Sequence, residues 1–232
     1  MHTNTVIILL RHAKLDNPQN LFYERGDTAI SNEGIDETIR TSQELKRKLE
    51  LSGRRLEFIL HSPLPRAQQT AEIYAAELGL HLQHDKRLIE RGSSGLIGKS
   101  ITEIEGPCKG DLYNNPNKDY EIEMPEEIAN RMEHCLRGVL ESNRGQTVGL
   151  LSHGDPLDFL WERLTHPDQG IRSVIDIRGD GQAIQKSEAR ILLFDPTGKL
   201  LEHELIRVPK EKESIEDQTT QETESHSRGV EF

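Results

Sequence analysis

Two histidines and two arginines of this sequence come shortly after short apolar stretches. Arg11 and His12 directly follow the apolar residues 6–10, and His153 follows a second such stretch by a single serine. Arg66 comes a few residues after a third. A neutral imidazole can attack phosphorus near pH 7, and guanidinium groups donate paired hydrogen bonds to phosphate oxygens. These residue types are together suited to phosphoryl transfer.

One carboxylate fits the same chemistry. Glu90 lies in the glycine-rich stretch 88–98, and a carboxylic acid can protonate a leaving alkoxide. The stretch alone is weak evidence, because exposed Glu-Arg pairs are ordinary. Asp155 lies close enough to His153 to be a rival acid, although it also fits a helix cap. Two arginines already offer positive charge, so this chemistry requires no metal ion.

Three apolar stretches must position these side chains. Residues 6–10, 56–60 and 147–151 have the length and composition of strands buried on both faces. Open α/β sheets place their sites at the carboxyl ends of such strands, which is where the histidines stand. For the first stretch alone, a core strand capped by two polar residues is an equally good interpretation.

Helix signals follow each of these strands. Ser31, Ser62 with Pro63, and Asp155 with Pro156 resemble helix starts, and Pro125 begins a further apolar periodicity. Arg66 then lies in a first helical turn, beside unpaired N–H groups, which is an arrangement that binds anions. Gly154 would allow the backbone to approach a ligand closely.

The remaining sequence predicts an edge hairpin, an insertion and a tail. Residues 190–194 and 200–206 flank a turn signature at 195–198, so we expect an antiparallel hairpin. Residues 99–124 have little periodicity and read as an insertion that forms part of a lid. Residues 209–232 mix seven acidic and three basic residues with Ser, Thr and Gln, so we expect a disordered acidic tail after a catalytic domain at 1–208.

Composition narrows the choice of partners. The formal charge of −11 argues against nucleic-acid and membrane binding, since both reward clustered Lys and Arg. The sequence has no stretch of about 18 apolar residues, and its N-terminus lacks a signal peptide. Cys108 and Cys135 have no metal or disulfide spacing, and His81 with His84 reads as a solvated pair. We expect a cytoplasmic protein with no metal and no cofactor.

Four stretches, taken in order, form a known pattern. They are Leu-Arg-His-Ala at 10–13, Ser-Pro-Leu-x-Arg-Ala-x-Gln-Thr-Ala at 62–71, the stretch around Glu90, and Ser-His-Gly at 152–154. This pattern resembles the histidine phosphatase superfamily, in the branch that includes cofactor-dependent phosphoglycerate mutases. The resemblance implies a three-layer α/β/α sandwich with a mainly parallel central sheet. It also implies site roles: His12 as the phosphorylated nucleophile, Glu90 as the proton donor, and a phosphate pocket of Arg11, Arg66 and His153 with Gly154.

Departures from the pattern bear on the activity. Gly92-Ser93-Ser94 stands where the mutases have His-Tyr-Gly, and Ile101 stands where they have a lysine. We therefore expect a metal-independent phosphomonoesterase acting on a small phosphorylated substrate through phosphohistidine. A phosphoglycerate mutase is the alternative enzyme. A phospho-ligand-binding module without turnover is a third possibility, which the intact set of nucleophile and acid argues against. Substrate and oligomeric state are left open.

Overall fold

The elements follow the order that the apolar stretches predict. The structure, a computed structural model, describes residues 4–22, 28–92, 94–106, 108, 111–114 and 121–210. Its strands are β1 (Thr5–Arg11), β2 (Phe58–His61), β3 (His81–His84), β4 (Thr147–Ser152), β5 (Ala189–Phe194) and β6 (Leu200–Ile206). Its helices are α1 (Asn32–Leu51), α2 (Pro65–Leu78), α3 (Ile101–Glu105), α4 (Pro125–Ser142), α5 (Gly154–Thr165) and α6 (Val174–Gly179), with 3-10 turns η1 (Lys86–Leu88), η2 (Ser94–Leu96) and η3 (Leu112–Asn114).

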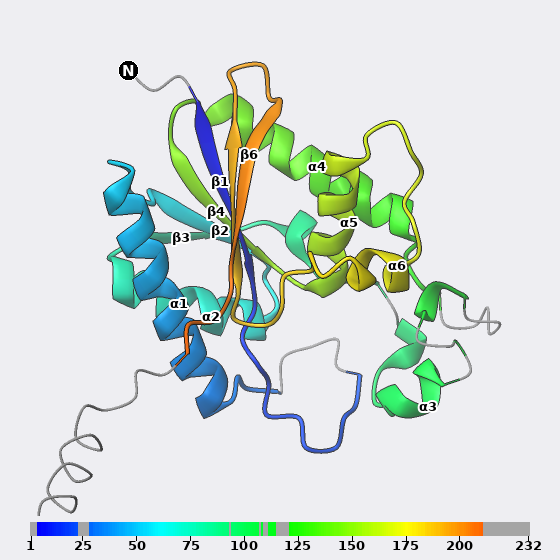
Figure 1. The fold of residues 1–232 in the computed structure, drawn as a ribbon. Coiled ribbons are helices and arrows are strands. Elements are labelled where there is room, and N and C mark those ends of the chain that lie inside the picture. The colour runs from blue at the N-terminus through cyan, green and yellow to red at the C-terminus, as the bar shows by residue number, and fades with distance from the viewer. Residues whose placement is uncertain are drawn as a thin grey trace, which may run out of the picture.

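β1 lies inside a six-stranded sheet of order β3-β2-β4-β1-β5-β6 (Figure 1). It pairs parallel with β4 and antiparallel with β5. Its residues from Thr5 to Leu10 are buried on both faces of the sheet, as the unbroken apolar run predicts. The chain leaves this strand at its carboxyl end, and Arg11 and His12 are delivered there.

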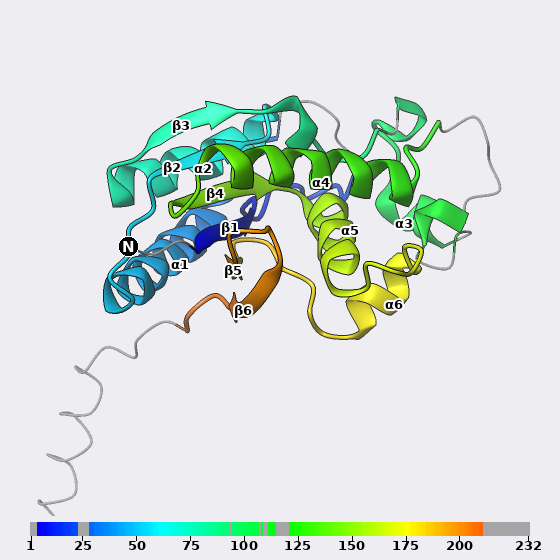
Figure 2. The same cartoon turned by 90° about the horizontal axis from the view of Figure 1, so that it is seen from above.

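Helices cover both faces of the sheet (Figures 1 and 2). On one face Ile8 and Leu10 pack into a core cluster with residues of α1 and α2. On the other face Ile7 and Leu9 pack into a larger cluster with residues of α4 and α5. Figure 2 shows α3 and α6 at the far end of the molecule, beyond α5. The expected three-layer α/β/α sandwich with a mainly parallel sheet is confirmed.

The predicted edge hairpin is also confirmed. β5 and β6 pair antiparallel, and the turn between them closes through a Gly198 N–H bond of 3.0 Å to the Asp195 carbonyl. The Asp195 carboxylate accepts hydrogen bonds from the backbone N–H groups of Thr197 and Lys199. Gly198 has φ of +85°, which a glycine adopts without strain.

Two predicted helix starts are wrong by two residues. α2 begins at Pro65 rather than Pro63, and the Ser62 hydroxyl accepts both the backbone N–H of Leu64, at 3.3 Å, and a hydrogen bond from the ring of His153. α5 begins at Gly154, with His153 as its N-cap residue. Asp155 is therefore inside the first turn, where its carboxylate binds other side chains. Arg66 still lies in a first helical turn, as expected.

The sequence analysis missed β3 and α6. β3 is an edge strand of four residues, His81–His84, with almost no apolar content, so it lacks the alternation that identifies a strand.

Some predictions cannot be compared with the structure in full. The loop at 15–28, the insertion at 99–124 and the tail at 209–232 all include residues outside the described ranges. No helix of the described chain is both long and apolar enough to cross a membrane.

Candidate active site

A cavity of about 360 Å³ opens at the carboxyl ends of β1 and β4 and the start of α2. Five of the six residues expected at the site line it: Arg11, His12, Arg66, Glu90 and Gly154. The sixth, His153, is fully buried directly behind, with its ring centroid 5.0 Å from that of His12. We call Arg11, His12 and Arg66 the floor of this cavity. The floor therefore joins residues from two separate parts of the chain, the end of β1 and the first turn of α2.

His12 has one ring nitrogen fixed and the other unprotonated. Its Nδ1 lies 2.8 Å from the carbonyl oxygen of Ala13, and a carbonyl only accepts, so Nδ1 carries the proton. Burial holds the pKa of His12 well below its ordinary value, and the charges of Arg66 and Arg11 lower it further. The ring is thus neutral at pH 7, and Nε2 keeps a free electron pair.

Thr70 fixes the position of the chain around His12 relative to Arg66. The backbone N–H of Ala13 donates to Thr70 Oγ1 at 3.0 Å. The same hydroxyl donates to the Arg66 carbonyl oxygen at 2.7 Å, one helical turn earlier. One buried side chain therefore ties the end of β1 to the first turn of α2. The sequence analysis gave Thr70 no role, since a threonine within a helix has no local signature of such a contact.

His153 orients Arg66. Arg66 Nε donates to His153 Nδ1 at 3.2 Å, so the proton of this neutral ring is on Nε2, which donates to Ser62 Oγ at 2.8 Å. Burial, followed by the charge of Arg66, lowers the pKa of His153 well below its ordinary value. Both ring nitrogens are thus paired with protein groups. His153 does not line the cavity itself and acts on it in this structure through Arg66, which it orients.

Gly154 makes room for Arg11. A Cβ on Gly154 would lie 2.8 Å from Arg11 Nη2, closer than real Cβ contacts allow. The guanidinium also donates from Nη1 to the Ile184 carbonyl at 2.8 Å, while its buried Nε has no hydrogen-bond partner among the described residues. The sequence suggested that Gly154 would allow the backbone to approach a ligand closely. In the structure, its missing side chain leaves room for Arg11, which lines the cavity.

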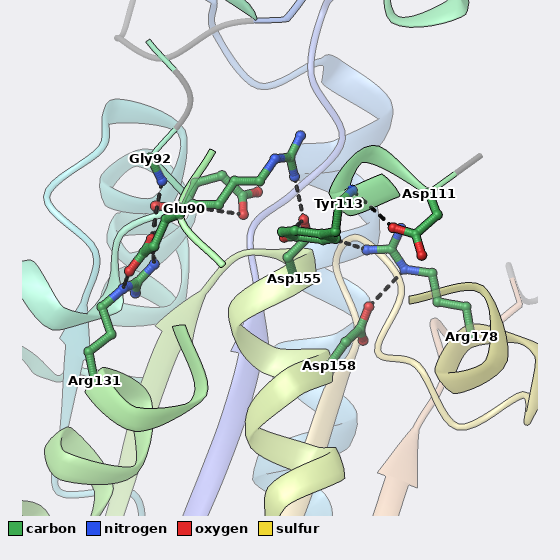
Figure 3. A network of polar contacts seen from close by, with 10 residues as sticks. Glu90, Gly92, Asp111, Tyr113, Arg131, Asp155, Asp158 and Arg178 are labelled. Carbon is green, nitrogen blue, oxygen red and sulfur yellow. Dashed lines mark hydrogen bonds and ion pairs between the residues drawn. The ribbon is translucent and has the colours of Figure 1, made fainter. Parts of the chain in front are cut away.

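Glu90 and Asp155 lie in contrasting environments. Glu90 lines the cavity, and its Oε1 accepts only the N–H of Arg91, at 3.0 Å, among the hydrogen bonds of the described chain. Asp155 is buried and receives hydrogen bonds from Arg91, from the Tyr113 hydroxyl (2.6 Å) and from Arg178 Nη2 (2.5 Å) (Figure 3). Burial opposes its ionisation, but Arg91 and Arg178 outweigh that effect and hold the pKa of Asp155 below its ordinary value. Asp155 is therefore a carboxylate with no proton to donate.

Arg131, from α4, holds the backbone that carries Glu90 (Figure 3). It donates hydrogen bonds to three carbonyl oxygens, those of Arg87 (2.8 Å), Ile89 (2.9 Å) and Glu90 (3.3 Å). Its guanidinium also forms a paired contact of 2.7 and 2.9 Å with Glu123, whose carboxylate accepts the N–H of Gly92 at 3.1 Å. The loop on both sides of Glu90 is thus fixed to a core helix.

Several residues of the site carried no signal in the sequence. Tyr113, Arg131 and Arg178 stand far along the chain from the motifs and reach the site only through tertiary packing.

The histidines and cysteines to which the sequence gave no role do not line the cavity. His81 and His84 are exposed on β3, and Cys108 and Cys135 are buried without a disulfide, burial raising the pKa of Cys135 to about 12. Over the described ranges, no three His, Cys, Asp or Glu side chains form a group that could hold a metal ion.

Known proteins share both the sequence pattern and the fold. A 2,3-bisphosphoglycerate-dependent phosphoglycerate mutase of Methylobacterium sp. (strain 4-46) is 28% identical over 166 residues, which are 67% of this chain and 78% of that protein. The solved structure of Bacillus stearothermophilus YhfR has a TM-score of 0.70 at 20% identity, covering 90% of this chain and 98% of that one. A mycobacterial glucosyl-3-phosphoglycerate phosphatase in complex with VO3 has a TM-score of 0.67 at 19% identity, covering 86% and 96%.

The family is shown by the extent of the match rather than by any one relative. Residues 7–182 match the family described as the histidine phosphatase superfamily (branch 1). The matched region contains every residue of the cavity floor, as well as Glu90 and His153. This chain belongs to the histidine phosphatase superfamily, branch 1.

Proposed function

We propose that this protein is a phosphomonoesterase that forms a phosphohistidine on His12. The observation that carries the proposal is the state of the His12 ring. Its Nδ1–H is committed to a carbonyl, so the lone pair of Nε2 is available, and two guanidinium groups lie beside it. A nucleophile with this protonation state needs no separate base.

The reaction proceeds in two displacements. His12 Nε2 forms a bond to phosphorus while the bond from phosphorus to the alcohol oxygen breaks. Arg11 and Arg66 offset the charge on the phosphoryl oxygens, and Glu90 gives its proton to the departing alkoxide. Water then attacks phosphorus, the P–N bond breaks, and Glu90 takes a proton from that water. Inorganic phosphate leaves and the imidazole is regenerated.

Glu90 is preferred to Asp155 as the acid for a physical reason. Asp155 is held ionised by two arginines, whereas Glu90 faces the cavity with no arginine or lysine hydrogen-bonded to its carboxylate among the described residues. We also propose that catalysis needs neither metal nor cofactor, because the floor supplies two fixed positive charges. Two buried cysteines without a disulfide agree with a reducing compartment such as the cytoplasm.

A phosphoglycerate mutase is the second candidate, favoured by the mutase relative at 28% identity. Both activities pass through phosphorylated His12, so labelling the enzyme does not separate them. Incubation with 3-phosphoglycerate and 2,3-bisphosphoglycerate does. Rapid isomer formation with little free phosphate would overturn the phosphatase assignment, whereas free phosphate without isomerisation supports it.

The phosphohistidine itself is tested by rapid quench. The enzyme is mixed with p-nitrophenyl phosphate, and the quenched protein is digested and mapped by mass spectrometry. We expect an acid-labile, base-stable phosphate on His12 that is absent from His12→Ala. His84→Ala, an exposed histidine on β3, is the matched control and should label as wild type. Phosphate on another residue would contradict the assignment.

A further inference from the structure

The cavity has, besides its cationic floor, a wall of apolar side chains. Apart from Ile89, which precedes Glu90, six apolar side chains line the cavity, and none of them is fully buried. They are Leu15, Leu21, Phe22, Leu64, Ile97 and Ile101, which we call the outer wall. Ile97 leaves 48% of its surface exposed, which is unusual for an isoleucine. Apolar side chains gathered at the mouth of a site mark a surface that an apolar ligand can cover.

The outer wall is built by hydrogen bonding between two segments far apart in sequence. The backbone N–H of Phe22 donates to Lys99, the N–H of Gly98 donates back to Phe22, and the N–H of Ile101 donates to Asn20, each at 2.9 Å. Phe22 also packs against a small core cluster of its own, formed by Leu96, Ile104, Cys108 and Leu112. The apolar side chains are therefore held in place before any ligand arrives.

Arginines next to the outer wall already have carboxylate partners. Arg91, whose guanidinium lies 5.7 Å from the centre of the Phe22 ring, pairs with Asp155. Arg178 pairs with Asp155 and Asp158. Part of the charge and donor capacity of each guanidinium is therefore already committed to a protein carboxylate.

Lys186 is the remaining cation of the cavity lining, and it belongs to the phosphate end. Among the described residues its ammonium group makes no hydrogen bond or ion pair. The charges of Arg11 and Arg66 act on it, and its own charge acts on His12, so it lies near the floor. Positive charge that is free for substrate is thus concentrated where the phosphoryl group sits.

We propose that the outer wall binds the alcohol part of the substrate, and that this part is an uncharged aryl or medium-chain alkyl group. This inference rests on the proposed function, because it takes the floor to be the phosphate site. The phosphoryl group binds the cationic floor, and the carbon chain runs outward over the six apolar side chains. A cavity of about 360 Å³ lies at the small end of the range for small-molecule sites, so a compact monoester fits.

Binding of n-alkylphosphonates tests the proposal without requiring turnover. Their C–P bond is not hydrolysed, so calorimetry on the full chain gives Kd whether or not the enzyme is a phosphatase. Each buried methylene is worth up to about fourfold in affinity. We expect hexylphosphonate to bind at least about tenfold more tightly than methylphosphonate. Equal Kd values for the two phosphonates would overturn the proposal.

Two substitutions at one position sharpen the test. Ile97→Ser should remove most of the chain-length preference while leaving the Kd of methylphosphonate unchanged. Ile97→Lys should in addition tighten binding of 3-phosphoglycerate, because it places an unpaired cation on the outer wall. Leu201→Ser is the matched control, since Leu201 is 47% exposed but lies on β6 away from the cavity. Loss of the preference in Leu201→Ser, or its retention in Ile97→Ser, would count against the outer wall.

Turnover separates this inference from the function on which it rests. If p-nitrophenyl phosphate is hydrolysed but 3-phosphoglycerate is preferred to hexyl phosphate, the phosphatase stands and the outer-wall proposal falls. If no phosphomonoester is hydrolysed while the phosphonates keep their chain-length preference, the proposed function falls and the outer wall is supported as an apolar binding surface.

Discussion

The floor and the outer wall of one cavity are built on different principles. The floor comes from the carboxyl end of β1 and the start of α2, and its His12 and Arg66 are 4% and 7% exposed. The outer wall comes mainly from two inserted segments, and its side chains are half-exposed. The floor is therefore constrained by the core, whereas the outer wall can change without disturbing it. The residues that we propose for the reaction and those that we propose for substrate choice thus lie in separable parts of the molecule.

His12→Ala gives the largest expected effect and tests whether the floor alone carries the chemistry. We expect kcat/KM for p-nitrophenyl phosphate to fall at least about a thousandfold, because the nucleophile is lost. The far-ultraviolet circular dichroism spectrum should match wild type, since the strand that precedes the residue is unchanged. Residual activity within tenfold of wild type would contradict the nucleophile assignment.

The leaving group distinguishes Arg66 from Glu90. We propose that Arg66 binds the phosphoryl group common to all substrates, so Arg66→Ala should lower kcat/KM about a hundredfold for alkyl and p-nitrophenyl phosphates alike. An alkoxide needs a proton and nitrophenolate does not, so Glu90→Gln should cost alkyl phosphates at least about tenfold more. Steady-state kinetics with both substrates measures the difference. Equal losses in Glu90→Gln would remove Glu90 from the acid role.

Arg131→Lys tests whether Arg131, which holds the backbone around Glu90, positions the proposed acid. Lysine keeps the charge but cannot reproduce the paired contact with Glu123 and the three carbonyl bonds. We expect a loss of about three- to tenfold for alkyl phosphates and a smaller loss for p-nitrophenyl phosphate. A merely structural defect would lower both rates equally. Arg137→Lys, an exposed arginine of the same helix, should leave both rates unchanged.

Acid should lower the free energy of unfolding through the floor side of the cavity, because two buried histidines, His12 in the floor and His153 behind it, lie there and the outer wall has none. Burial and nearby arginines depress the pKa of both His12 and His153, so both are neutral when folded. As pH falls below about 6.5, the unfolded chain binds protons that the folded protein does not. The free energy of unfolding should drop by about 1.4 kcal/mol per pH unit for each histidine. Urea denaturation at several pH values measures the slope, which His12→Ala should reduce.

A chelator should have no effect on catalytic activity, which makes it the treatment with the smallest expected change. The floor provides its positive charge through Arg11 and Arg66, so EDTA should leave kcat/KM for p-nitrophenyl phosphate unchanged. Chelator and enzyme are incubated together before the assay, with EDTA already saturated with Mg²⁺ as the control. Activity that falls with EDTA and returns with a divalent ion would show that the floor is incomplete by itself.

The floor could be predicted from the sequence because its signals are local. An unbroken apolar run that is followed by Arg11 and His12 predicts both a buried strand and the residues that stand at its carboxyl end. The burial of His153 behind His12 follows from the parallel pairing of the two strands that precede them. The order of strands and helices then leaves few other arrangements of the sheet.

The outer wall could not be predicted in the same way. The pairing of Phe22 with Lys99 depends on where two inserted segments meet, and neither segment has a periodic pattern. The ionised state of Asp155 depends on Arg91 and also on Arg178, and Arg178 belongs to a short helix for which the sequence showed no recognisable motif. Even the start of α2 was misplaced by two residues: the Ser62 hydroxyl accepts both the Leu64 N–H and the ring N–H of His153, a residue distant in sequence. These features are decided by tertiary contacts that single-sequence patterns do not contain.

The interior position of β1 has a consequence for how the protein folds. Both of its partner strands come later in the chain, at residues 147–152 and 189–194. A nascent chain therefore contains His12 before it contains the strands that hold His12 in place. Pairing between segments so distant is entropically costly and slow to form. The order of synthesis thus makes β5 the last neighbour of β1 to become available, so the surroundings of the candidate site are completed only after that strand has been made.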